Sequence, residues 1–416
     1  MEEWKEYNLG ELIELNNGFA FKSKDFVTSG IPVIKIRNVK ANRISLEDVS
    51  YVSMETALNI KCTPIMPSDI LITMTGNRKD GSIDSWVGKV ALFNHEGLYL
   101  LNQRVSAIRI KHPNIVDYRY LAYFLSSFES QLYFINHSNS SGGQANISPE
   151  IVNNYIVNLP SLQTQKRISN LLKTFDDKIE LNRRINRNLE QQAQALFKAW
   201  FVDFEPFKNG KFVDSEFGRI PEGWNIVEAN HFMTISKDSI NPTKNPMCLY
   251  THYSIPAFDE ALTPEIQFGH KIKSNKFLVR SGMTLFSKLN PRIKRIWFIN
   301  EASDNSICST EFIPYESLGQ NCYFLYCYLN SNMFYSQAMS LVNGATGSHQ
   351  RFSPNETLKF LFAYKKEIVE EFNVLVAPTL KEMSELSLET RKIAKLRDTL
   401  LPRLMSGELN INTITE

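Results

Sequence analysis

The chain has 416 residues, 43% of them hydrophobic and 22% charged, so it is long enough for two or three domains and has an ordinary globular composition. A formal net charge of +2 neither requires nor excludes a nucleic-acid partner. No run of residues approaches the roughly 18 apolar residues of a membrane-spanning helix, and the polar start MEEWKEYNLG excludes a secretory signal peptide. We therefore expect a cytoplasmic protein that does not span a membrane.

Residues 1–160 alternate short apolar runs with Gly and Asn, a pattern that predicts strands and turns. The expected strands are Ile31–Val39, Asp69–Thr75, Gly88–Phe93, Leu100–Ile110 and Tyr155–Asn158. Apolar residues at helical spacing predict a helix over Asp117–Ile135, with Phe128 on its apolar face, and a polar loop follows at 137–146. Strict alternation in the first strand would place Lys35 and Arg37 on one face of it.

Residues 161–207 contain one narrow apolar stripe at steps of three, four or seven residues, without Gly or Pro before Pro206. The stripe consists of Ile168, Leu172, Phe175, Ile179, Asn182, Ile185, Leu189, Leu196 and Trp200. This spacing predicts a helix of about 60 Å, given a rise of about 1.5 Å per residue. A helix this long with one stripe needs a partner helix, and a buried amide at Asn182 would fix the pairing register.

A second stripe, from Ile368 to Leu404, predicts the partner helix and includes Phe372, Val376, Met383, Leu386, Ile393 and Leu400. Pro378 lies inside it and is expected to kink the helix or to begin a fresh one, and Pro402 to mark its end. Either stripe alone is equally typical of an ordinary core helix. Two of them, each closing one half of the chain, favour a paired coiled coil.

The second half of the chain repeats the first with a period near 200 residues. After a connector at 208–223, Trp224 restarts the pattern of Trp4, and Ser148-Pro149 recurs as Ser353-Pro354, 205 residues later (353 − 148). The strand Asp69–Thr75 corresponds to Met283–Ser287. The alternative is a chance likeness between two mixed α/β segments, but a period of this length favours two copies of a globular unit plus a long helix.

Basic residues concentrate in parts of the chain that are suited to phosphate contacts. No acidic residue occurs between Gly269 and Asn300, while this stretch contains Lys271, Lys273, Lys288, Arg292, Lys294 and Arg295. The first half contains two weaker sets, one of Lys35, Arg37, Lys40 and Arg43 and one of Asn77, Arg78 and Lys79. The alternative reading is a set of solvated strand edges.

Two polar loops occupy equivalent places before the repeated Ser-Pro pair, at 138–146 and 343–351. They carry groups that match base edges, Gln144 and Asn146 in the first and His349, Gln350 and Arg351 in the second. A solvated turn remains an equally good reading of any single residue among them.

The sequence offers no catalytic constellation. Asn241-Pro242, Asn245-Pro246 and Asn290-Pro291 are not followed by the Pro-Tyr or Pro-Phe of an adenine methyltransferase motif, and no G-x-x-x-x-G-K-[ST] phosphate loop occurs. Asp176-Asp177-Lys178 lies on the predicted helix and has no acidic pair upstream, so a solvated helix face is the better reading. The five cysteines form no CxxC pair and the seven His show no metal-ligand spacing, so we predict reduced structural thiols and no metal site.

Several long stretches resemble one protein family, the specificity subunits of type I restriction-modification systems. The stretch LPSLQTQKRISNLLKTFDDKIELNRRINRNLEQQAQALFKAWFVDFEPF is similar to the central conserved region of that family, and KIAKLRDTLLPRLMSGEL is similar to its C-terminal conserved region. GKVALFNHEGLYLLNQRVSAI resembles many of its target-recognition domains, and within this stretch we take Gln103 and Arg104 as DNA-binding candidates. The second unit departs from the pattern, since it has STEFIPY (309–315) where NQRV would fall.

The resemblance implies a chain without catalysis of its own that binds double-stranded DNA and reads a bipartite, asymmetric site. The implied partners are two modification subunits, which carry S-adenosylmethionine and methylate adenine, and restriction and translocation subunits that use ATP and Mg²⁺; the chain itself would hold no cofactor. The alternatives are a coiled-coil adaptor that does not read DNA, or a fragment of a fused restriction-methylation enzyme.

The expected fold is α+β, with two mixed α/β target-recognition domains separated by two long helices that form an antiparallel coiled coil, in an internal repeat with pseudo-two-fold symmetry. The expected boundaries are 1–160 and 224–365 for the recognition domains, 161–207 and 366–409 for the long helices, 208–223 for the connector and 410–416 for the tail.

Overall fold

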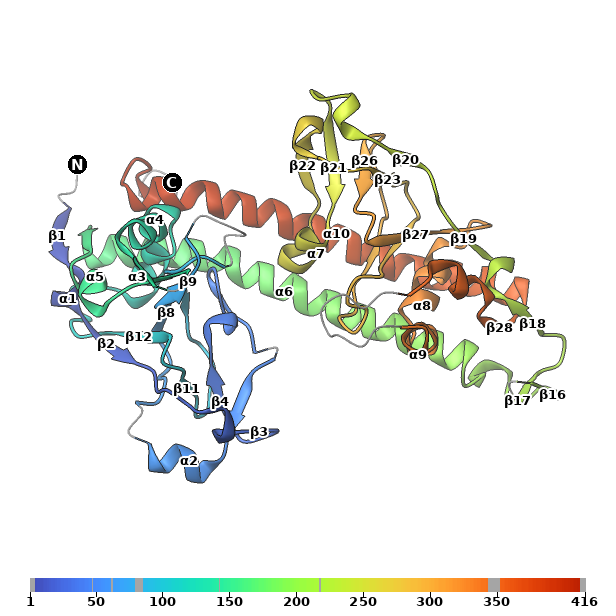
Figure 1. Ribbon diagram of the computed structural model, residues 1–416, viewed down its shortest axis with the longest axis horizontal. Coiled ribbons are helices and arrows are strands. Elements are labelled where there is room, and N and C mark those ends of the chain that lie inside the picture. The colour runs from blue at the N-terminus through green and yellow to red at the C-terminus, as the bar shows by residue number, and fades with distance from the viewer. Residues whose placement is uncertain are drawn as a thin grey trace. The chain divides into compact units, whose positions relative to one another are not determined.

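The computed structural model describes residues 4–46, 48–60, 63–78, 85–141, 143–216, 218–342 and 352–411. The chain forms two compact units (Figure 1). Unit 1 comprises Met1–Asp177 with Ile393–Glu416, and unit 2 comprises Lys178–Lys392. The two long helices, α6 (Leu162–Phe201) and α10 (Lys366–Met405), each contribute one part to each unit. The compact units therefore differ from the domains expected along the sequence, because each includes a share of both long helices.

Unit 1 is built on a four-stranded antiparallel sheet in the order β10-β8-β12-β2, next to a second sheet in the order β11-β4-β7-β3. Its remaining strands form the small sheets β1-β15, β5-β6 and β13-β14-β9. The elements are β1 (Lys5–Asn8), α1 (Leu9–Leu12), β2 (Ile13–Asn17), η1 (Ser23–Asp25), β3 (Phe26–Val27), β4 (Ile31–Ile34), η2 (Ile36–Asn38), β5 (Val39–Lys40), β6 (Arg43–Ile44), β7 (Ser50–Val52), α2 (Met54–Asn59), β8 (Ile70–Thr73), β9 (Thr75–Gly76), β10 (Val90–Leu92), β11 (Leu100–Leu101), β12 (Val105–Ile110), α3 (Tyr118–Leu125), α4 (Phe128–His137), β13 (Asn139–Ser141), β14 (Gln144–Asn146), α5 (Pro149–Asn153) and β15 (Ile156–Leu159).

Unit 2 has a four-stranded sheet in the order β19-β27-β24-β25 and a five-stranded sheet in the order β20-β23-β26-β21-β22. Two pairs, β16-β17 and β18-β28, complete it. The elements are η4 (Glu205–Phe207), β16 (Phe212–Ser215), β17 (Gly218–Pro221), β18 (Asn225–Glu228), η5 (Ala229–His231), β19 (Met233–Ile235), β20 (Ser239–Ile240), η6 (Pro242–Lys244), β21 (Leu249–Tyr253), α7 (Ile255–Ala261), β22 (Glu265–Phe268), η7 (Gly269–Lys271), β23 (Lys276–Leu278), β24 (Thr284–Ser287), β25 (Ile296–Phe298), β26 (Ser306–Cys308), β27 (Phe312–Ser317), α8 (Cys322–Asn330), α9 (Asn332–Ser340), η8 (Pro354–Lys359) and β28 (Leu361–Tyr364).

The two units share one topology, which confirms the internal repeat. The order β10-β8-β12-β2 in unit 1 is matched by β25-β24-β27-β19 in unit 2, so β8 and β24 are equivalent as predicted. A parallel pair recurs as β11 with β4 and as β26 with β21, and the pairing of β1 with β15 recurs as β18 with β28. Two short helices then follow the last long strand in each unit, α3 and α4 or α8 and α9.

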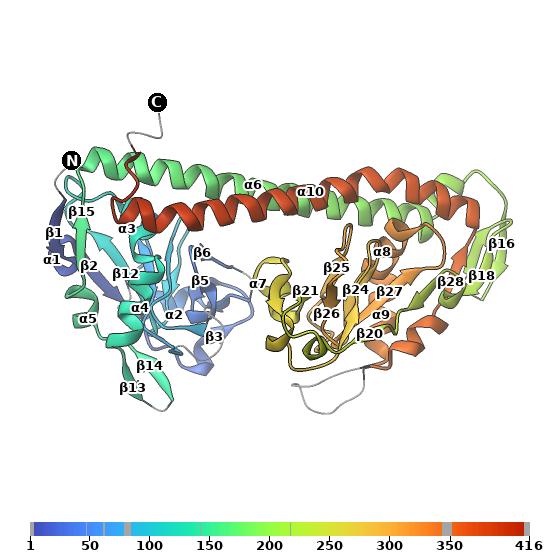
Figure 2. The same ribbon diagram turned by 90° about the horizontal axis from the view of Figure 1, so that it is seen from above.

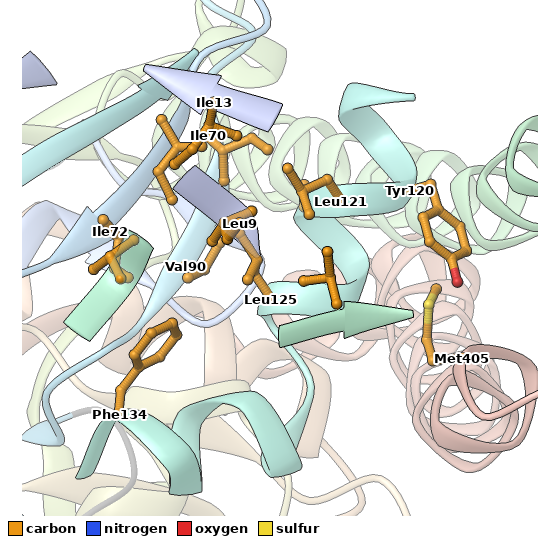
Figure 3. Close-up of a cluster of buried hydrophobic side chains, with 14 of the residues drawn as sticks. Leu9, Ile13, Ile70, Ile72, Val90, Tyr120, Leu121, Leu125, Phe134 and Met405 are labelled. Atoms are coloured by element: carbon orange, nitrogen blue, oxygen red, sulfur yellow. The ribbon is translucent and has the colours of Figure 1, made fainter. Parts of the chain in front are cut away.

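The main core of unit 1 lies between its four-stranded sheet and the helices α3 and α4 (Figure 3). Leu9, Ile70, Leu121 and Leu125 are fully buried there. The end of α10 adds Met405 to the same cluster. The C-terminal part of the chain is therefore an integral part of unit 1.

The long helices are antiparallel to each other, as the contacts within each unit establish (Figure 2). In unit 1, Arg397 Nη1 donates to Asp176 Oδ1 at 2.5 Å. In unit 2, Asn182 Nδ2 donates to Glu389 Oε2 at 2.7 Å, and Asn186 Nδ2 donates to Ser387 Oγ at 3.0 Å. Residue numbers rise on α6 as they fall on α10, which is the antiparallel sense predicted for the coiled coil. Among the described residues, no helix is both long and apolar enough to cross a bilayer.

A buried amide on a long helix caps a short helix in each unit. In unit 1, Gln165 Oε1 accepts from the Asp117 backbone N–H at 2.9 Å, and its Nε2 donates to the Ile115 carbonyl. In unit 2, Asn373 Oδ1 accepts from the backbone N–H groups of Tyr323 and Phe324 at 3.0 and 3.1 Å. These bonds satisfy donors that a helix start leaves without a partner, so they fix α3 and α8 on the long helices.

One ion pair occurs in both units with its polarity reversed. Arg109 on β12 pairs with Asp69, in the turn before β8, through two bonds of 2.8 and 2.7 Å. Glu316 occupies the matching position of β27, one residue beyond the pairing with the start of β24. It pairs with Arg280, in the turn before β24, at 2.8 Å. The strand therefore carries the cation in unit 1 and the anion in unit 2, and the turn carries the opposite charge in each.

The buried stripe on α6 departs from the predicted one in the part of the helix beyond Asn182. Four residues of the predicted stripe, Ile168, Leu172, Ile179 and Asn182, are at most 3% exposed. Phe175, Leu189, Leu196 and Trp200 are only half-buried, as are Met383, Leu386, Ile393 and Leu400 on α10. Beyond Asn182, the deeply buried residues of α6 are Ala193, Phe197 and Phe201. The shift follows from the aromatic core of unit 2, where Phe197 and Phe201 pack against Phe324, Phe362 and Phe372.

Helix α10 runs from Lys366 to Met405 without a break at Pro378, so no fresh helix begins there, and it ends three residues beyond Pro402. Pro378 is exposed on its helix. Val374, whose carbonyl would have accepted the missing hydrogen bond, is 72% exposed. Water can therefore replace the lost donor on this face of the helix.

Three predicted elements are interrupted, two of them by local side-chain bonding. The strand expected over Ile31–Val39 ends at Ile34, because the Asn38 side chain accepts from the Lys35 N–H at 3.0 Å and folds the chain into η2. The strand expected over Leu100–Ile110 divides into β11 and β12 around a turn. The helix expected over Asp117–Ile135 divides into α3 and α4, because the Ser127 hydroxyl caps the second helix.

Candidate nucleic-acid interface

The small sheet β13-β14-β9 brings together two predicted sites of unit 1 that are distant in sequence. Asn146 pairs with Thr75 in the sheet, and its Oδ1 accepts from Thr75 Oγ1 at 2.8 Å. Arg78, two residues beyond β9, donates from Nη2 to the Ser138 carbonyl at 2.7 Å, just before β13. The β13-β14 hairpin is therefore fixed to the segment that follows β8.

A turn between β11 and β12 adds two more predicted residues to this surface. Gln103 and Arg104 are both exposed in the turn. The Arg104 carbonyl accepts from the Met74 N–H at 2.9 Å, and the Met74 carbonyl accepts from the Ile147 N–H at 2.9 Å. This series of backbone bonds connects the turn to β9 and β14. We call Asn77, Arg78, Gln103, Arg104 and Gln144 the amide–arginine face of unit 1.

The members of this face present the groups that recognise base edges. Arg78, Arg104, Gln103 and Gln144 are exposed and Asn77 is half-buried. Arginine pairs with guanine, and asparagine or glutamine with adenine, through two hydrogen bonds each. Gly143 holds the hairpin turn at a φ of +80°, which favours glycine. Asn146 is already bonded to Thr75, so its role is to hold the sheet together.

Phe128 is an exposed aromatic residue beside this face that the helical pattern assigns to the core. It is 55% exposed at the start of α4, and its ring centroid lies 6.4 Å from that of Trp86. Trp86 forms an isolated bridge with Asn77. The break between α3 and α4 rotates Phe128 outward, and spacing alone could not reveal this.

Lys35 and Arg37 lie apart from this face and do not share one side of a strand. The Lys35 ammonium lies 3.5 Å from the centroid of the Phe26 ring, and burial together with the nearby Arg37 charge lowers its pKa. Arg37 is exposed and donates to the Asp48 carbonyl. The structure assigns the Lys35 cation to packing against an aromatic ring.

In unit 2, the predicted cations Lys288, Arg292, Lys294 and Arg295 lie on one loop, the β24–β25 loop (288–295). Arg292 is exposed and Lys288 is half-buried, and the described residues provide no partner for either side chain. Because β24 is equivalent to β8, this loop is the counterpart of the segment that carries Asn77 and Arg78. Both units thus place predicted DNA-binding residues on the connection that leaves the same strand.

Arg295 differs from the other cations of this loop because it is 8% exposed. Its Nε and Nη2 donate to the two oxygens of Asp259 on α7, at 2.6 and 2.8 Å. Asp259 lies outside the stretch without acidic residues, so the neutralisation of Arg295 was not visible along the sequence. We therefore assign Arg295 to the fold and leave it out of the proposed DNA-binding surface.

Lys271 and Lys273 are exposed at η7 and just beyond it, in a different part of unit 2 from the β24–β25 loop. Lys79, His349, Gln350 and Arg351 lie outside the described residues. Within the described ranges, no group of three or more His, Cys, Asp or Glu side chains is arranged to hold a metal ion.

Comparisons with known proteins agree on one family. Residues 1–191 match the family model described as type I restriction modification DNA specificity domain. The type I restriction enzyme HindI specificity subunit of Haemophilus influenzae is 24% identical over 98% of this chain and 100% of its own length. The MjaIX specificity subunit of Methanocaldococcus jannaschii is 27% identical over 61% of each chain, so this chain spans about three fifths of that relative.

A solved structure has the same fold. The crystal structure of the S subunit of a type I restriction-modification system from M. genitalium superposes with a TM-score of 0.56, covering 97% of this chain and 96% of that one. Its sequence identity is 13%, so the likeness concerns the fold alone. Residues 1–191 therefore match the specificity-domain model, and the chain over nearly its whole length is similar to a type I restriction enzyme specificity subunit.

Proposed function

We propose that this chain is the DNA-binding specificity subunit of a type I restriction-modification complex and that its two units read the two parts of a bipartite DNA site. The observation that carries the proposal is the equivalent placement of exposed recognition groups. In each unit, the connection that leaves β8 or β24 carries an exposed arginine, Arg78 in unit 1 and Arg292 in unit 2. Phosphate contacts from such cations give affinity and orientation, while amides and arginines on the same surface distinguish bases.

The two parts of the site differ under this proposal, because the two units present different side chains. The amide–arginine face of unit 1 combines Gln and Asn with Arg, whereas the β24–β25 loop offers Lys288 and Arg292. Two readers with the same topology and different side chains recognise an asymmetric site.

The proposed partners are two modification subunits, which bind S-adenosylmethionine and methylate adenine, and restriction subunits that use ATP and Mg²⁺. The chain contributes DNA recognition to this complex and no catalytic group. In support, the sequence lacks an adenine methyltransferase motif and a phosphate-binding loop. We place the complex in the cytoplasm, where its DNA substrate is.

The test is a genome-wide map of methylated adenine in cells with and without this gene, followed by reconstitution of the chain with its methyltransferase partner. We expect one bipartite, asymmetric methylated motif that disappears with the gene and returns with the reconstituted complex. An unchanged map would contradict the proposal. Methylation that persists at the same motif when the amide–arginine face is replaced by alanines would instead favour an adaptor that does not read DNA.

A further inference from the structure

The β24–β25 loop of unit 2 is held at three points by residues outside it. The Tyr335 hydroxyl on α9 donates to the Pro291 carbonyl at 2.7 Å. The Lys294 ammonium donates to the Asn330 carbonyl, at the end of α8, at 2.5 Å. Arg295 is bound by Asp259 on α7, as described above. Of the four cations on the loop, Lys294 and Arg295 are therefore bound to protein groups, while the part of the chain that the structure describes provides no partner for the side chains of Lys288 and Arg292.

The Lys294 contact leads directly to the long helix α6. Glu190 on α6 accepts hydrogen bonds from Asn330 Nδ2 and from the Tyr326 hydroxyl, both on α8. Asn330 thus binds Lys294 through its carbonyl and Glu190 through its side chain. The same ammonium lies 5.5 Å from the centroid of the Tyr335 ring. A continuous series of contacts therefore runs from the loop through α8 to α6, entirely within unit 2.

Glu190, at one end of this series, is half-buried, and Lys294, at the other end, is exposed but lies against protein groups. Burial raises the pKa of Glu190, although its hydrogen bonds from Tyr326, Gln194 and Asn330 and the Lys294 charge oppose the rise. Burial lowers the pKa of Lys294, against the attraction of Glu190. The Lys294 charge favours the ionised form of Glu190, and both side chains bind Asn330, so loss of either one should disturb the contacts that connect the loop to α6.

We propose that Lys294 and Glu190 are positioning residues, which hold the β24–β25 loop so that Lys288 and Arg292 contact DNA phosphates. The inference rests on the proposed function. It assigns different roles to two cations that look alike in the sequence, since Arg292 binds DNA and Lys294 fixes the loop. It also gives Glu190, an acidic residue about one hundred positions earlier, a part in binding to a polyanion.

The salt dependence of DNA affinity distinguishes residues that contact phosphates from residues that position the loop. Each phosphate contact contributes about 0.9 to the slope of log affinity against log salt. The affinity of the complete complex for a duplex carrying its methylated motif is measured over a series of KCl concentrations. Arg292→Ala and Lys288→Ala should each lower the slope by about one. Lys294→Met should weaken binding at every salt concentration with little change in slope.

Glu190→Gln gives the sharpest test, because electrostatics and positioning predict opposite results. Removal of a negative charge would strengthen binding to DNA if charge alone mattered. Loss of the support for α8 should instead weaken binding by roughly tenfold, or about 1.4 kcal/mol. Glu180→Gln is the matched control, since Glu180 is exposed on the same helix and its ion pair with Arg187 is a surface pair of little energetic weight.

Footprinting distinguishes positioning from a general loss of fold. In the Glu190→Gln complex, hydroxyl-radical protection should weaken over the part of the motif read by unit 2 and remain over the part read by unit 1. Tyr335→Phe, which removes only the hydroxyl that binds Pro291, should give the same pattern and serves if Glu190→Gln does not fold. A slope lowered by about one in Lys294→Met would make Lys294 a phosphate contact and overturn the proposal, as would unchanged affinity in both Glu190→Gln and Tyr335→Phe. Absence of binding by the wild-type complex would contradict the proposed function itself.

Discussion

His252 on β21 is a half-buried residue that contributes to the pH dependence of unit 2. Its Nδ1 lies 3.4 Å from Gln267 Oε1, and its buried Nε2 has no partner among the described residues. Burial, with a smaller contribution from the Lys276 charge, lowers its pKa to about 4, while the contact with Gln267 opposes the shift. The folded protein therefore holds this imidazole neutral under conditions in which the unfolded chain protonates it.

A histidine with a lowered folded-state pKa destabilises the fold as pH falls. Below the unfolded-state value of about 6.5, the unfolded chain gains a proton that the folded chain does not, so stability decreases until about pH 4. We expect His252→Gln to reduce this loss between pH 6.5 and 4 by as much as about 3 kcal/mol. Urea unfolding at a series of pH values measures it, with His270→Gln, an exposed histidine in η7, as the control. Parallel pH profiles for wild type and His252→Gln would contradict the assignment.

For single residues, the sequence could identify candidate DNA-binding cations but not the carboxylates that neutralise some of them. The stretch 269–300 contains no acidic residue, yet Arg280 and Arg295 are both neutralised, by Asp238 and Glu316 in one case and by Asp259 in the other. These carboxylates come from strands, turns and helices outside the stretch. A count of charges along the chain does not include the neighbours that the fold brings across a sheet.

Among the elements, the long helices could be predicted almost completely because their stabilising pattern is local. Spacing of three and four residues predicted α6 and α10 to within a few residues. The shorter elements were less certain, since the turn at Asn38 divides a predicted strand and the cap at Ser127 divides a predicted helix, each through a single side-chain bond. The shift of the α6 stripe toward Phe197 and Phe201 depends on the aromatic core of unit 2, which no helical periodicity encodes.

Substitution of Asn182 would test whether a buried amide lowers the stability of α6 while it fixes the register of the helix pair. Its Nδ2 bonds to Glu389, but its Oδ1 is buried with no partner among the described residues. An unsatisfied buried acceptor costs about 1–3 kcal/mol. Asn182→Leu should therefore raise the urea midpoint of unfolding, whereas Asn188→Leu, at an exposed position of the same helix, should leave it nearly unchanged.

The same substitution should loosen the register of the helix pair. Asn186 Nδ2 and Ser387 Oγ are 3.0 Å apart in the native pairing. Disulfide formation between Asn186→Cys and Ser387→Cys should be slower when Asn182 is replaced by leucine, since an apolar stripe tolerates sliding better than a buried amide does. A lower urea midpoint together with unchanged cross-linking would show that Asn182 contributes stability rather than register.

For the molecule as a whole, the repeat predicts that one half of the chain can act as a dimer. A truncated chain of residues 1–207 retains the strands of unit 1 and all of α6, but it loses the part of α10 that contributes Leu401, Leu404 and Met405 to the core of unit 1. An isolated helix with an uncovered apolar stripe is unstable in water, so a second copy of α6 should take the place of α10.

Two identical readers recognise an inverted repeat. With its methyltransferase partner, the truncated chain should therefore methylate a palindromic version of the part of the motif that unit 1 reads. Analytical ultracentrifugation should show a dimer of the truncated chain. A folded monomer, or methylation that stays on the original asymmetric motif, would mean that the two halves are not interchangeable.

The reversed ion pairs limit how the two halves of the gene can recombine. A crossover between the codons for β8 and β12, joined to the matching region of the second half, would place Asp69 near a residue equivalent to Glu316. Two carboxylates would then meet where Asp69 is only 2% exposed, and the reciprocal product would bring Arg280 against Arg109. Exchange of the whole segment, from the turn before β8 to the end of β12, keeps each cation with its anion. Viable recombinants between the halves should therefore inherit this segment as a single block.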